Sequence, residues 1–441
     1  MPTFTISAQR AALGDGVQAA TLTVADGVIA AVTPGADPAA DVALGPDDVL
    51  LPGAVDTHVH LNEPGRTEWE GFATGTRAAS LGGVTTVLDM PLNSVPPTTT
   101  PAALATKREA ARGQLSVDLG YWGGAVPQNL GHLEELWDAG VFGFKSFTLP
   151  SGVDEFEPLD RAQLLAAQRE IAGFGGLHIV HCEDRATIEA APAPASRAYA
   201  DFLLSRPDRA EVAAITEVIA ACRETGARTH ILHLSSAQGA DLVAAAKAEG
   251  LPLTAETCPH YLCLASESIP DAAPQYKCCP PIRDDGNRNA LWDALLAGVI
   301  DIVVTDHSPA TAERKFAGDG DLQQAWGGIA GVQVGFTAML DEATRRGVSL
   351  ERVADWMSVR PAEIVGLSAK GGLAAGKDAD LAVWQASSPQ VADVRRLAHK
   401  NPISAWDGCA FGGTVGRVWL RGAELDRGPV AVPAGRELFR R

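Results

Sequence analysis

The hydrophobic and polar positions along the central part of the chain follow one repeated pattern. A short run of β-branched and other apolar residues is followed by a polar loop and then by an amphipathic segment rich in Ala, Leu and Glu. The short runs predict strands, near residues 51–60, 84–90, 116–124, 140–147, 176–182, 228–234, 251–258 and 300–306. The amphipathic segments predict helices, among them 68–80, 100–112, 160–172, 208–223, 237–248 and 287–297.

Strands that alternate with helices are typical of parallel sheets with right-handed crossovers. Eight such units over roughly 250 residues favour an α/β fold of the (β/α)8, or TIM-barrel, type. The structural alternative is an open, doubly wound sheet. No glycine-rich dinucleotide-binding loop follows the first predicted strand, and this weakens the alternative.

The two ends of the chain show a different pattern. Residues 1–50 and 372–441 hold short strand-like runs that are separated by Gly and Asp turns. We expect both ends to pair into one small β-sandwich domain. It would lie beside a barrel domain made of residues 51–371.

The first predicted barrel strand ends with two histidines, His58 and His60. Residues two apart on a strand project from the same face, so both imidazoles can reach one metal ion from inside the barrel mouth. A His-x-His pair alone is often incidental. Its position raises its significance, because TIM-barrel enzymes place their chemistry at the carboxyl ends of the strands.

Four other strand ends carry comparable side chains. His181 and His233 end the fifth and sixth predicted strands, Asp306 ends the eighth, and Lys145 lies between two phenylalanines on the fourth. One histidine at a strand end is usually a polar core residue with satisfied hydrogen bonds. Four histidines, an aspartate and a lysine at five strand ends are hard to explain in that way, and we interpret them as a metal centre.

Imidazole and carboxylate ligands suit zinc, and also cobalt, manganese or iron. Six ligand positions exceed what one tetrahedral site uses, so they imply two divalent metal ions about 3.5–4 Å apart. An ammonium group cannot bind a cation, but burial among aromatic rings favours the neutral amine of Lys145. A neutral amine can react with carbon dioxide to give a carbamate, which is a bridging carboxylate.

Charge and composition exclude other classes of partner. The formal net charge of −18 argues against a nucleic-acid partner, whose phosphates would be repelled. No apolar stretch approaches the ~20 residues that span a bilayer, and residues 1–6 lack the start of a secretory signal. The seven scattered cysteines form no Cys-x-x-Cys pair and indicate free thiols. We therefore expect a cytoplasmic protein that binds neither nucleic acid nor membranes.

Six motifs resemble the cyclic amidohydrolase family, over about residues 50–385. They are HVHLNEPGRTEWEG at 58–71, GGVTTVLDMPLNS at 82–94, ETCPHY at 256–261, CPPIRD at 279–284, TDHSP at 305–309 and AWGGIAG at 325–331. The resemblance implies a binuclear centre whose ligands are His58, His60, carbamylated Lys145, His181, His233 and Asp306. It also implies a homo-oligomer, a tetramer in this family. Within the family, the motifs most resemble those of the branch that hydrolyses the hydantoin ring of allantoin to allantoate, and this is the activity that the resemblance implies.

The expected reaction follows from these ligands. Two metal ions that share a hydroxide give a nucleophile at neutral pH, and one of them can polarise the ring carbonyl. Asp306 would take the hydroxide proton and deliver it to the departing ring nitrogen. This second transfer matters because an amide anion is a poor leaving group.

Substrate contacts are expected at four further positions. In similar dihydroorotases an arginine follows the His-x-His-Leu run and pairs with the substrate carboxylate. Here that position is Asn62, whose amide suits a neutral ureido group better. Asn93 is a second candidate through the resemblance. Ser308 and the loop at Gly328 are expected to present backbone groups to the ring.

Rival functions stay open at this point. A hydantoinase, dihydropyrimidinase or dihydroorotase would share the metal centre. A catalytically silent scaffold would lack stoichiometric metal, and a mononuclear deaminase would not need Lys145. Of the other histidines, we expect His132, His178 and His399 to be surface or packing residues.

Overall fold

The computed structural model describes residues 3–428 and 432–440. Its centre is a barrel of parallel strands, each hydrogen-bonded to the next in chain order. These strands are β6 (Ala54–Val59), β7 (Val84–Asp89), β8 (Asp118–Tyr121) continued by β9 (Gly123–Gly124), β10 (Phe144–Phe147), β11 (Leu177–His181), β12 (Arg228–Ile231), β13 (Leu253–Thr257) and β14 (Ile302–Val303). A bridge between Val59 and His307 closes the ring. The predicted (β/α)8 barrel is therefore confirmed.

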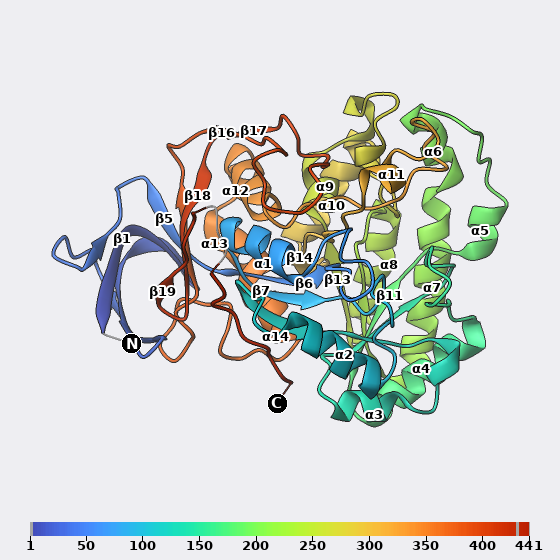
Figure 1. The fold of residues 1–441 in the computed structure, drawn as a ribbon, viewed down its shortest axis with the longest axis horizontal. Coiled ribbons are helices and arrows are strands. Elements are labelled where there is room, and N and C mark those ends of the chain that lie inside the picture. Colours follow the sequence, from blue (N-terminus) through green and yellow to red (C-terminus); the bar gives the residue numbers. More distant parts are fainter. Residues whose placement is uncertain (1–2, 429–431, 441) are drawn as a thin grey trace.

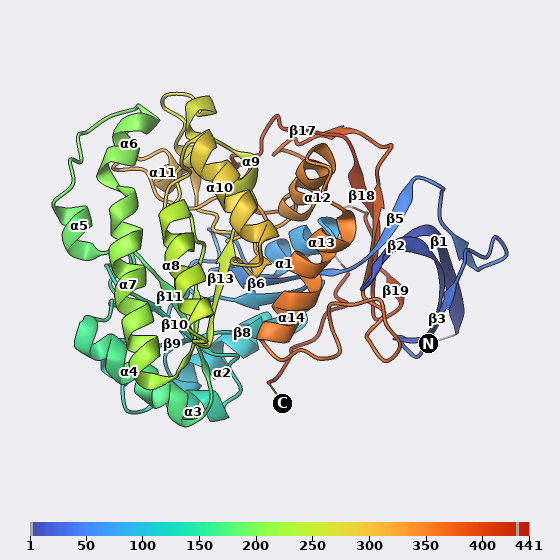
Figure 2. The ribbon, with the colours of Figure 1, turned by 180° about the vertical axis from the view of Figure 1, so that it is seen from behind.

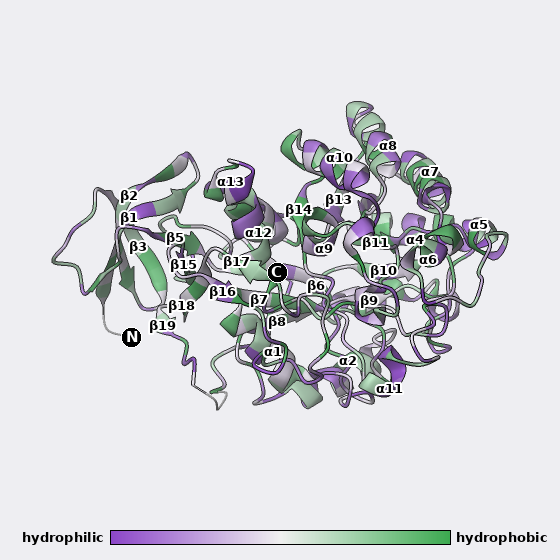
Figure 3. Cartoon of the chain, turned by 90° about the horizontal axis from the view of Figure 1, so that it is seen from above, coloured by the Kyte–Doolittle hydropathy of each residue, from purple (hydrophilic) through white to green (hydrophobic). Residues whose placement is uncertain are grey.

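Helices surround the barrel (Figures 1 and 2), and the longer ones bury apolar side chains. The main ones are α1 (Phe72–Leu81), α2 (Pro101–Ala111), α3 (Leu133–Asp138), α4 (Arg161–Gly173), α7 (Asp208–Thr225), α8 (Ala237–Ala248), α10 (Asp285–Leu296) and α12 (Gly335–Arg345). The side chains of Thr100, Asp160, Ser236 and Asp284 cap four of them by accepting a backbone N–H three residues on. Outer helices such as α7, α8 and α10 carry both hydrophilic and hydrophobic residues (Figure 3), as expected where one face meets solvent.

Shorter elements lie in the connections. The helices are α5 (Arg185–Glu189), α6 (Tyr199–Ser205), α9 (Pro259–Cys263), α11 (Ala312–Lys315), α13 (Leu350–Ala354) and α14 (Arg360–Ile364), with a π-helical turn over Asp355–Val359. Three 3-10 turns span Pro127–Asn129, Ser266–Ser268 and Pro274–Tyr276, and β16 (Gln390–Val391) pairs with β17 (Ala410–Phe411). No helix in the described part of the chain is both long and apolar enough to cross a membrane.

Strands from both ends of the chain form one separate sheet beside the barrel (Figure 1). Its order is β19-β18-β15-β5-β1-β2-β3, and β4 pairs with β1. The bounds are β1 (Phe4–Leu13), β2 (Gly16–Ala25), β3 (Val28–Pro34), β4 (Val42–Ala43), β5 (Asp48–Pro52), β15 (Leu381–Gln385), β18 (Thr414–Leu420) and β19 (Ala423–Glu424). A core of its own includes Ile6, Leu22, Leu50, Leu381 and Trp419. The expectation that both ends build one small β unit is confirmed.

The predicted first barrel strand, 51–60, was wrong at its start. The chain up to Pro52 belongs to β5 in the end sheet, and the barrel strand begins after Gly53. A side chain at Gly53 would place its Cβ 2.4 Å from the side chain of Thr85, so glycine allows the chain to pass between the two sheets. The predicted helix 68–80 likewise begins only at Phe72.

Part of the C-terminal region leaves the end sheet and packs on the barrel. The amide of Leu438 donates to the carbonyl of Leu119 on β8 at 2.7 Å. Nearby, the Lys370 ammonium binds the carboxylates of Asp118 at 2.6 Å and Asp380 at 2.7 Å, all three side chains being buried. This cluster joins the barrel to the end sheet through charge-assisted hydrogen bonds.

Candidate metal centre

A cavity of about 330 Å³ opens at the carboxyl ends of the barrel strands. All six predicted metal ligands line it, together with Asn93, Ser308 and Gly328 of the four predicted substrate contacts. Further polar groups on its wall are Ser151, Arg206, Lys277, Gln323 and Gln324. The six side chains that the sequence assigned to a metal centre therefore share one cavity.

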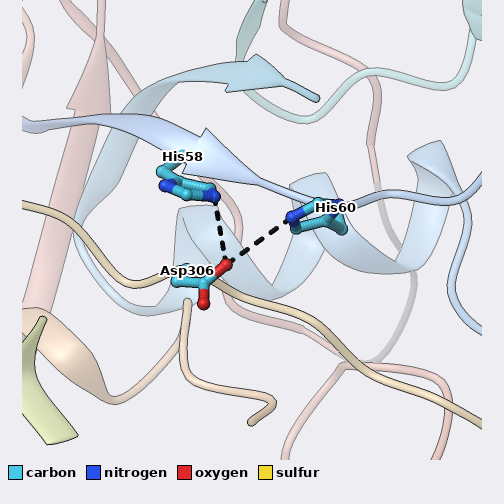
Figure 4. A group of neighbouring side chains, drawn as sticks. All are labelled: His58, His60 and Asp306. Carbon is cyan, nitrogen blue, oxygen red and sulfur yellow. Dashed lines mark ion pairs between the residues drawn. The ribbon is translucent and has the colours of Figure 1, made fainter. Parts of the chain in front are cut away.

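His58, His60 and Asp306 form the tightest part of this group (Figure 4). The His58 Nε2 atom lies 3.1 Å from Asp306 Oδ1, and the His60 Nε2 atom lies 3.6 Å from the same oxygen. Both imidazoles point toward the carboxylate from the first barrel strand and the residue after it. The spacing of two residues on β6 thus produces the convergence that the sequence predicted.

The other three predicted ligands adjoin this group. The ring of His233 lies 5.4 Å from that of His58 and 4.5 Å from that of His181, measured between centroids. The Lys145 Nζ atom lies 4.5 Å from the centroid of the Phe147 ring, which stacks on His181. Lys145 therefore faces the cavity beside His181, with an aromatic ring as its neighbour.

Burial sets the protonation of most of these groups. It lowers the pKa of Lys145 to about 8 and that of His60 to about 4, and it also lowers the pKa of His181 and of His233. Removal from water disfavours the charged form of a base. Three of the histidines are thus neutral imidazoles at pH 7, which is the form that binds a metal ion.

His58 differs because carboxylates flank it on both sides. Burial alone would lower its pKa, but the charges of Asp306 and Glu256 raise it to about 9. Its Nδ1 atom donates to Glu256 Oε1 at 2.5 Å, while its Nε2 atom faces Asp306 without a hydrogen bond. A nitrogen lone pair and a carboxylate oxygen at 3.1 Å require a proton or a metal cation between them.

The donor set fits a divalent cation. Within the described residues, His58 Nε2 and His233 Nδ1 are buried and have no hydrogen-bond partner, which is costly unless something else binds them. Imidazole nitrogens together with a carboxylate suit zinc and similar ions. These unpartnered nitrogens are the structural observation that favours a metal at this site.

Glu256 holds His58 from behind. Its second oxygen, Oε2, binds His230 Nε2 at 3.0 Å, and His230 Nδ1 binds the Thr254 hydroxyl at 2.7 Å. Burial would raise the pKa of Glu256, but the His58 charge and the two histidine hydrogen bonds lower it to about 2. A carboxylate on the outer nitrogen of a ligand histidine fixes the tautomer and orientation of the ring.

Glu183 does the same for His181. The His181 Nε2 atom lies 2.8 Å from Glu183 Oε2, which also accepts from Arg206 Nη1 at 2.5 Å. Burial opposes ionisation of this carboxyl, but the Arg206 charge and the His181 hydrogen bond lower its pKa to about 2. The side chain of Glu183 is 2% exposed, so its negative charge serves these two partners.

Of the predicted substrate contacts, Asn62 does not line the cavity. It is 1% exposed, has a left-handed backbone with φ of 63°, and directs its Nδ2 atom toward the Pro309 carbonyl at 3.4 Å. Ser308 lines the cavity, and its hydroxyl lies within hydrogen-bond distance of two Asp306 acceptors, the backbone carbonyl oxygen at 2.8 Å and Oδ1 at 2.9 Å. A Cβ at Gly328 would lie 2.3 Å from the Ser308 carbonyl oxygen, so only glycine brings this loop so close.

The remaining histidines lie outside the cavity lining. His132 is exposed, and His178 and His399 are buried in packing positions. The sequence reasoning gave no role to Glu256, Glu183 or Arg206. Glu183 carried a signal, because it follows His181 by two residues and so projects from the same face.

Comparison with known proteins gives a consistent result. The amidohydrolase family matches residues 49–425. The allantoinase of Streptomyces avermitilis is 52% identical over 97% of this chain and 96% of its own length. The allantoinase of Saccharomyces cerevisiae is 47% identical over 85% of this chain and 82% of its own length. Among solved structures, an L-hydantoinase (dihydropyrimidinase) from Arthrobacter aurescens superposes with a TM-score of 0.91 at 30% identity, over 99% of this chain and 100% of that one.

Proposed function

The chain belongs to the amidohydrolase family, and from this premise we propose that it hydrolyses the hydantoin ring of allantoin to give allantoate. The observation that carries the reaction class is the convergence of four histidines, an aspartate and a lysine on one cavity at the barrel mouth. The choice of allantoin rests on relatives named allantoinase at 37–52% identity over most of the chain. The enzyme is thus a metal-dependent hydrolase of a cyclic amide.

Two divalent ions, most suitably zinc, would when bound polarise the ring carbonyl and lower the pKa of the attacking water molecule. The proposed ligands are His58, His60, His181, His233 and Asp306, and Lys145 would join them as a carbamate, which would supply a carboxylate-like negative charge. Support for the carbamate comes from burial of the lysine, which lowers the pKa of Lys145 to about 8 and makes the neutral amine accessible.

Asp306 is the proposed acid and base. Burial would raise its pKa, but the surrounding histidines, His58 first, lower it well below the usual value. It is therefore ionised and can take a proton from the attacking water. The same carboxyl then gives that proton to the departing ring nitrogen, while the Ser308 hydroxyl orients its Oδ1 atom. Asn93 and the Gly328 loop line the space that the ring would occupy.

A substrate panel tests this proposal. Purified, zinc-supplemented protein is compared on allantoin, hydantoin, dihydrouracil and dihydroorotate at equal concentration, with Asp306→Asn purified in parallel as the control for contaminating activity. We expect allantoin to be opened far faster than the other rings. Preference for hydantoin or dihydrouracil would keep the metal centre and replace the substrate assignment. A protein that holds two metals and opens none of the rings would refute the reaction class.

Assembly and location complete the proposal. A homotetramer is expected from the family resemblance, and light scattering on the purified protein measures its mass directly. We place the enzyme in the cytoplasm because all seven cysteines are free thiols, which a reducing compartment maintains.

A further inference from the structure

Arg206 is a charged residue of the cavity that the proposed reaction does not use. It follows α6, in the connection between β11 and α7, and its side chain lines the cavity while remaining 22% exposed. Its backbone is held on both sides, since its N–H donates to the Leu203 carbonyl at 3.1 Å and its own carbonyl accepts from Arg283. The guanidinium is therefore presented from a fixed position.

Most of its hydrogen-bonding capacity is unused. A guanidinium has five N–H donors in a planar fork, and Arg206 donates through Nη1 to Glu183. Among the described residues, neither Nε nor Nη2 has a partner. Lys277, which also lines the cavity, is committed instead to the carbonyls of Gln323 and Ala325 at 3.3 and 2.6 Å.

The position of Arg206 relative to the reacting centre is set by a short chain of hydrogen bonds. Glu183 Oε2 accepts from Arg206 and lies 2.8 Å from His181 Nε2. The guanidinium is thus two hydrogen bonds away from a proposed metal ligand. Arg206 lines the same cavity of about 330 Å³ as Asp306 and the ligand histidines, so it is available to a substituent on a ring that binds there.

We propose that Arg206 determines specificity by binding the carbonyl oxygen of the ureido arm of allantoin. This inference rests on the proposed function and adds the group that recognises the arm. A guanidinium binds a neutral carbonyl acceptor more strongly than an uncharged N–H donor does, because its hydrogen bonds are charge-assisted. Gln324, which lines the same cavity, donates its Nε2 to Asp321 at 2.9 Å, which leaves its Oε1 atom to accept from the ureido N–H groups.

The test compares two rings that differ in the arm alone. Wild type, Arg206→Gln and Arg206→Lys are assayed on allantoin and on unsubstituted hydantoin. If hydantoin is not turned over, its inhibition constant against allantoin replaces its KM. Arg185→Gln is the matched control, because Arg185 lies in the same connection between β11 and α7 but pairs with Glu189 on the surface and does not line this cavity. Metal content and melting temperature are measured for every variant.

We expect Arg206→Gln to raise KM for allantoin by about 10- to 100-fold, the loss typical of a hydrogen bond to a charged group. Hydantoin binding, metal content and the behaviour of Arg185→Gln should be unchanged, and Arg206→Lys should recover part of the loss. An equal loss on both rings, or loss of a metal ion, would show that Arg206 acts only through Glu183 on His181 and would overturn the inference. A wild-type enzyme that does not prefer allantoin would instead refute the proposed function.

Discussion

Glu256→Gln removes one negative charge behind the centre while keeping the shape of the side chain. Glu256 accepts hydrogen bonds from His58 Nδ1 and His230 Nε2 at the same time, and it is 1% exposed. A glutamine has one acceptor oxygen, so it can accept from only one of the two histidines. Its NH2 group faces the other, whose proton must move to the opposite ring nitrogen.

Two magnitudes follow. Loss of a carboxylate partner on a ligand histidine typically costs about 10–100-fold in metal affinity. In the metal-free protein, the pKa of Glu256 is lowered from 4.5 to about 2. A carboxyl with a depressed folded-state pKa adds stability that is present above pH 4.5 and is lost as the pH falls toward 2. At neutral pH this contribution is on the order of 3 kcal/mol, and the variant should lose much of it.

Chelator competition followed by metal analysis measures the affinity, and urea unfolding of the metal-free proteins measures the stability. Glu211→Gln is the matched control, because Glu211 is equally buried but binds Arg283 and the backbone N–H groups of Ser235 and Ser236, none of them a proposed ligand. It should keep the metal affinity of the wild type. If Glu256→Gln also kept that affinity, Glu256 would not support the His58 ligand and the reasoning would fail.

Four further outcomes are expected. Asp306→Asn should lower kcat for allantoin by at least about 100-fold, because the group that moves the proton is lost; a wild-type rate would contradict this role. Gly328→Ala should lower kcat/KM by up to about 100-fold, since its Cβ would lie 2.3 Å from the Ser308 carbonyl oxygen, and unchanged kinetics would show that the loop yields without effect. Removal of metal with a chelator should abolish activity and lower the melting temperature, because unpartnered buried nitrogens remain; identical melting curves would argue against a metal. Burial raises the pKa of Glu211 to about 7 despite the Arg283 charge, so its ionisation opposes folding by ~3 kcal/mol as pH rises from 4.5 through 7. Glu211→Gln should therefore gain stability relative to wild type between pH 5 and pH 8 in urea unfolding, and a constant difference would contradict the shift.

The barrel, and the convergence of the six proposed ligands on one cavity, were predictable from the sequence for a geometric reason. In a closed parallel barrel the carboxyl ends of all strands meet at one face. Side chains at those ends therefore converge, however far apart they lie in sequence. Most of the barrel sequence lies between His58 and Asp306, yet the two side chains are in contact. Each could be placed at the barrel mouth from its position at a strand end alone.

The supporting residues were not predictable in the same way. Glu256 contacts His58 only because β13 and the first barrel strand both turn side chains into the barrel interior, which depends on the closed tertiary structure. The Asn62 side chain does not line the cavity, because the left-handed backbone at this residue turns its amide toward the Pro309 carbonyl. The sequence pattern did not reveal this backbone conformation. The strand boundary at Gly53 depended on a close contact with Thr85, and the sequence pattern does not show such contacts.

On two sides of the proposed centre, a buried glutamate binds the outer nitrogen of a proposed ligand histidine, but the two glutamates have different further partners. Glu256 connects His58 inward, to His230 and then to the half-buried Thr254, so this half is shielded from the substrate. Glu183 connects His181 outward, to Arg206 on the cavity wall. An acceptor that binds the free N–H groups of Arg206 shares the positive charge that otherwise acts on Glu183, and so changes the negative charge that His181 experiences. Among the described residues, the contacts of Glu256 on the His58 side include no such cavity-lining cation. Substrate binding should consequently perturb the two proposed metal sites unequally, with the larger change at the His181 site.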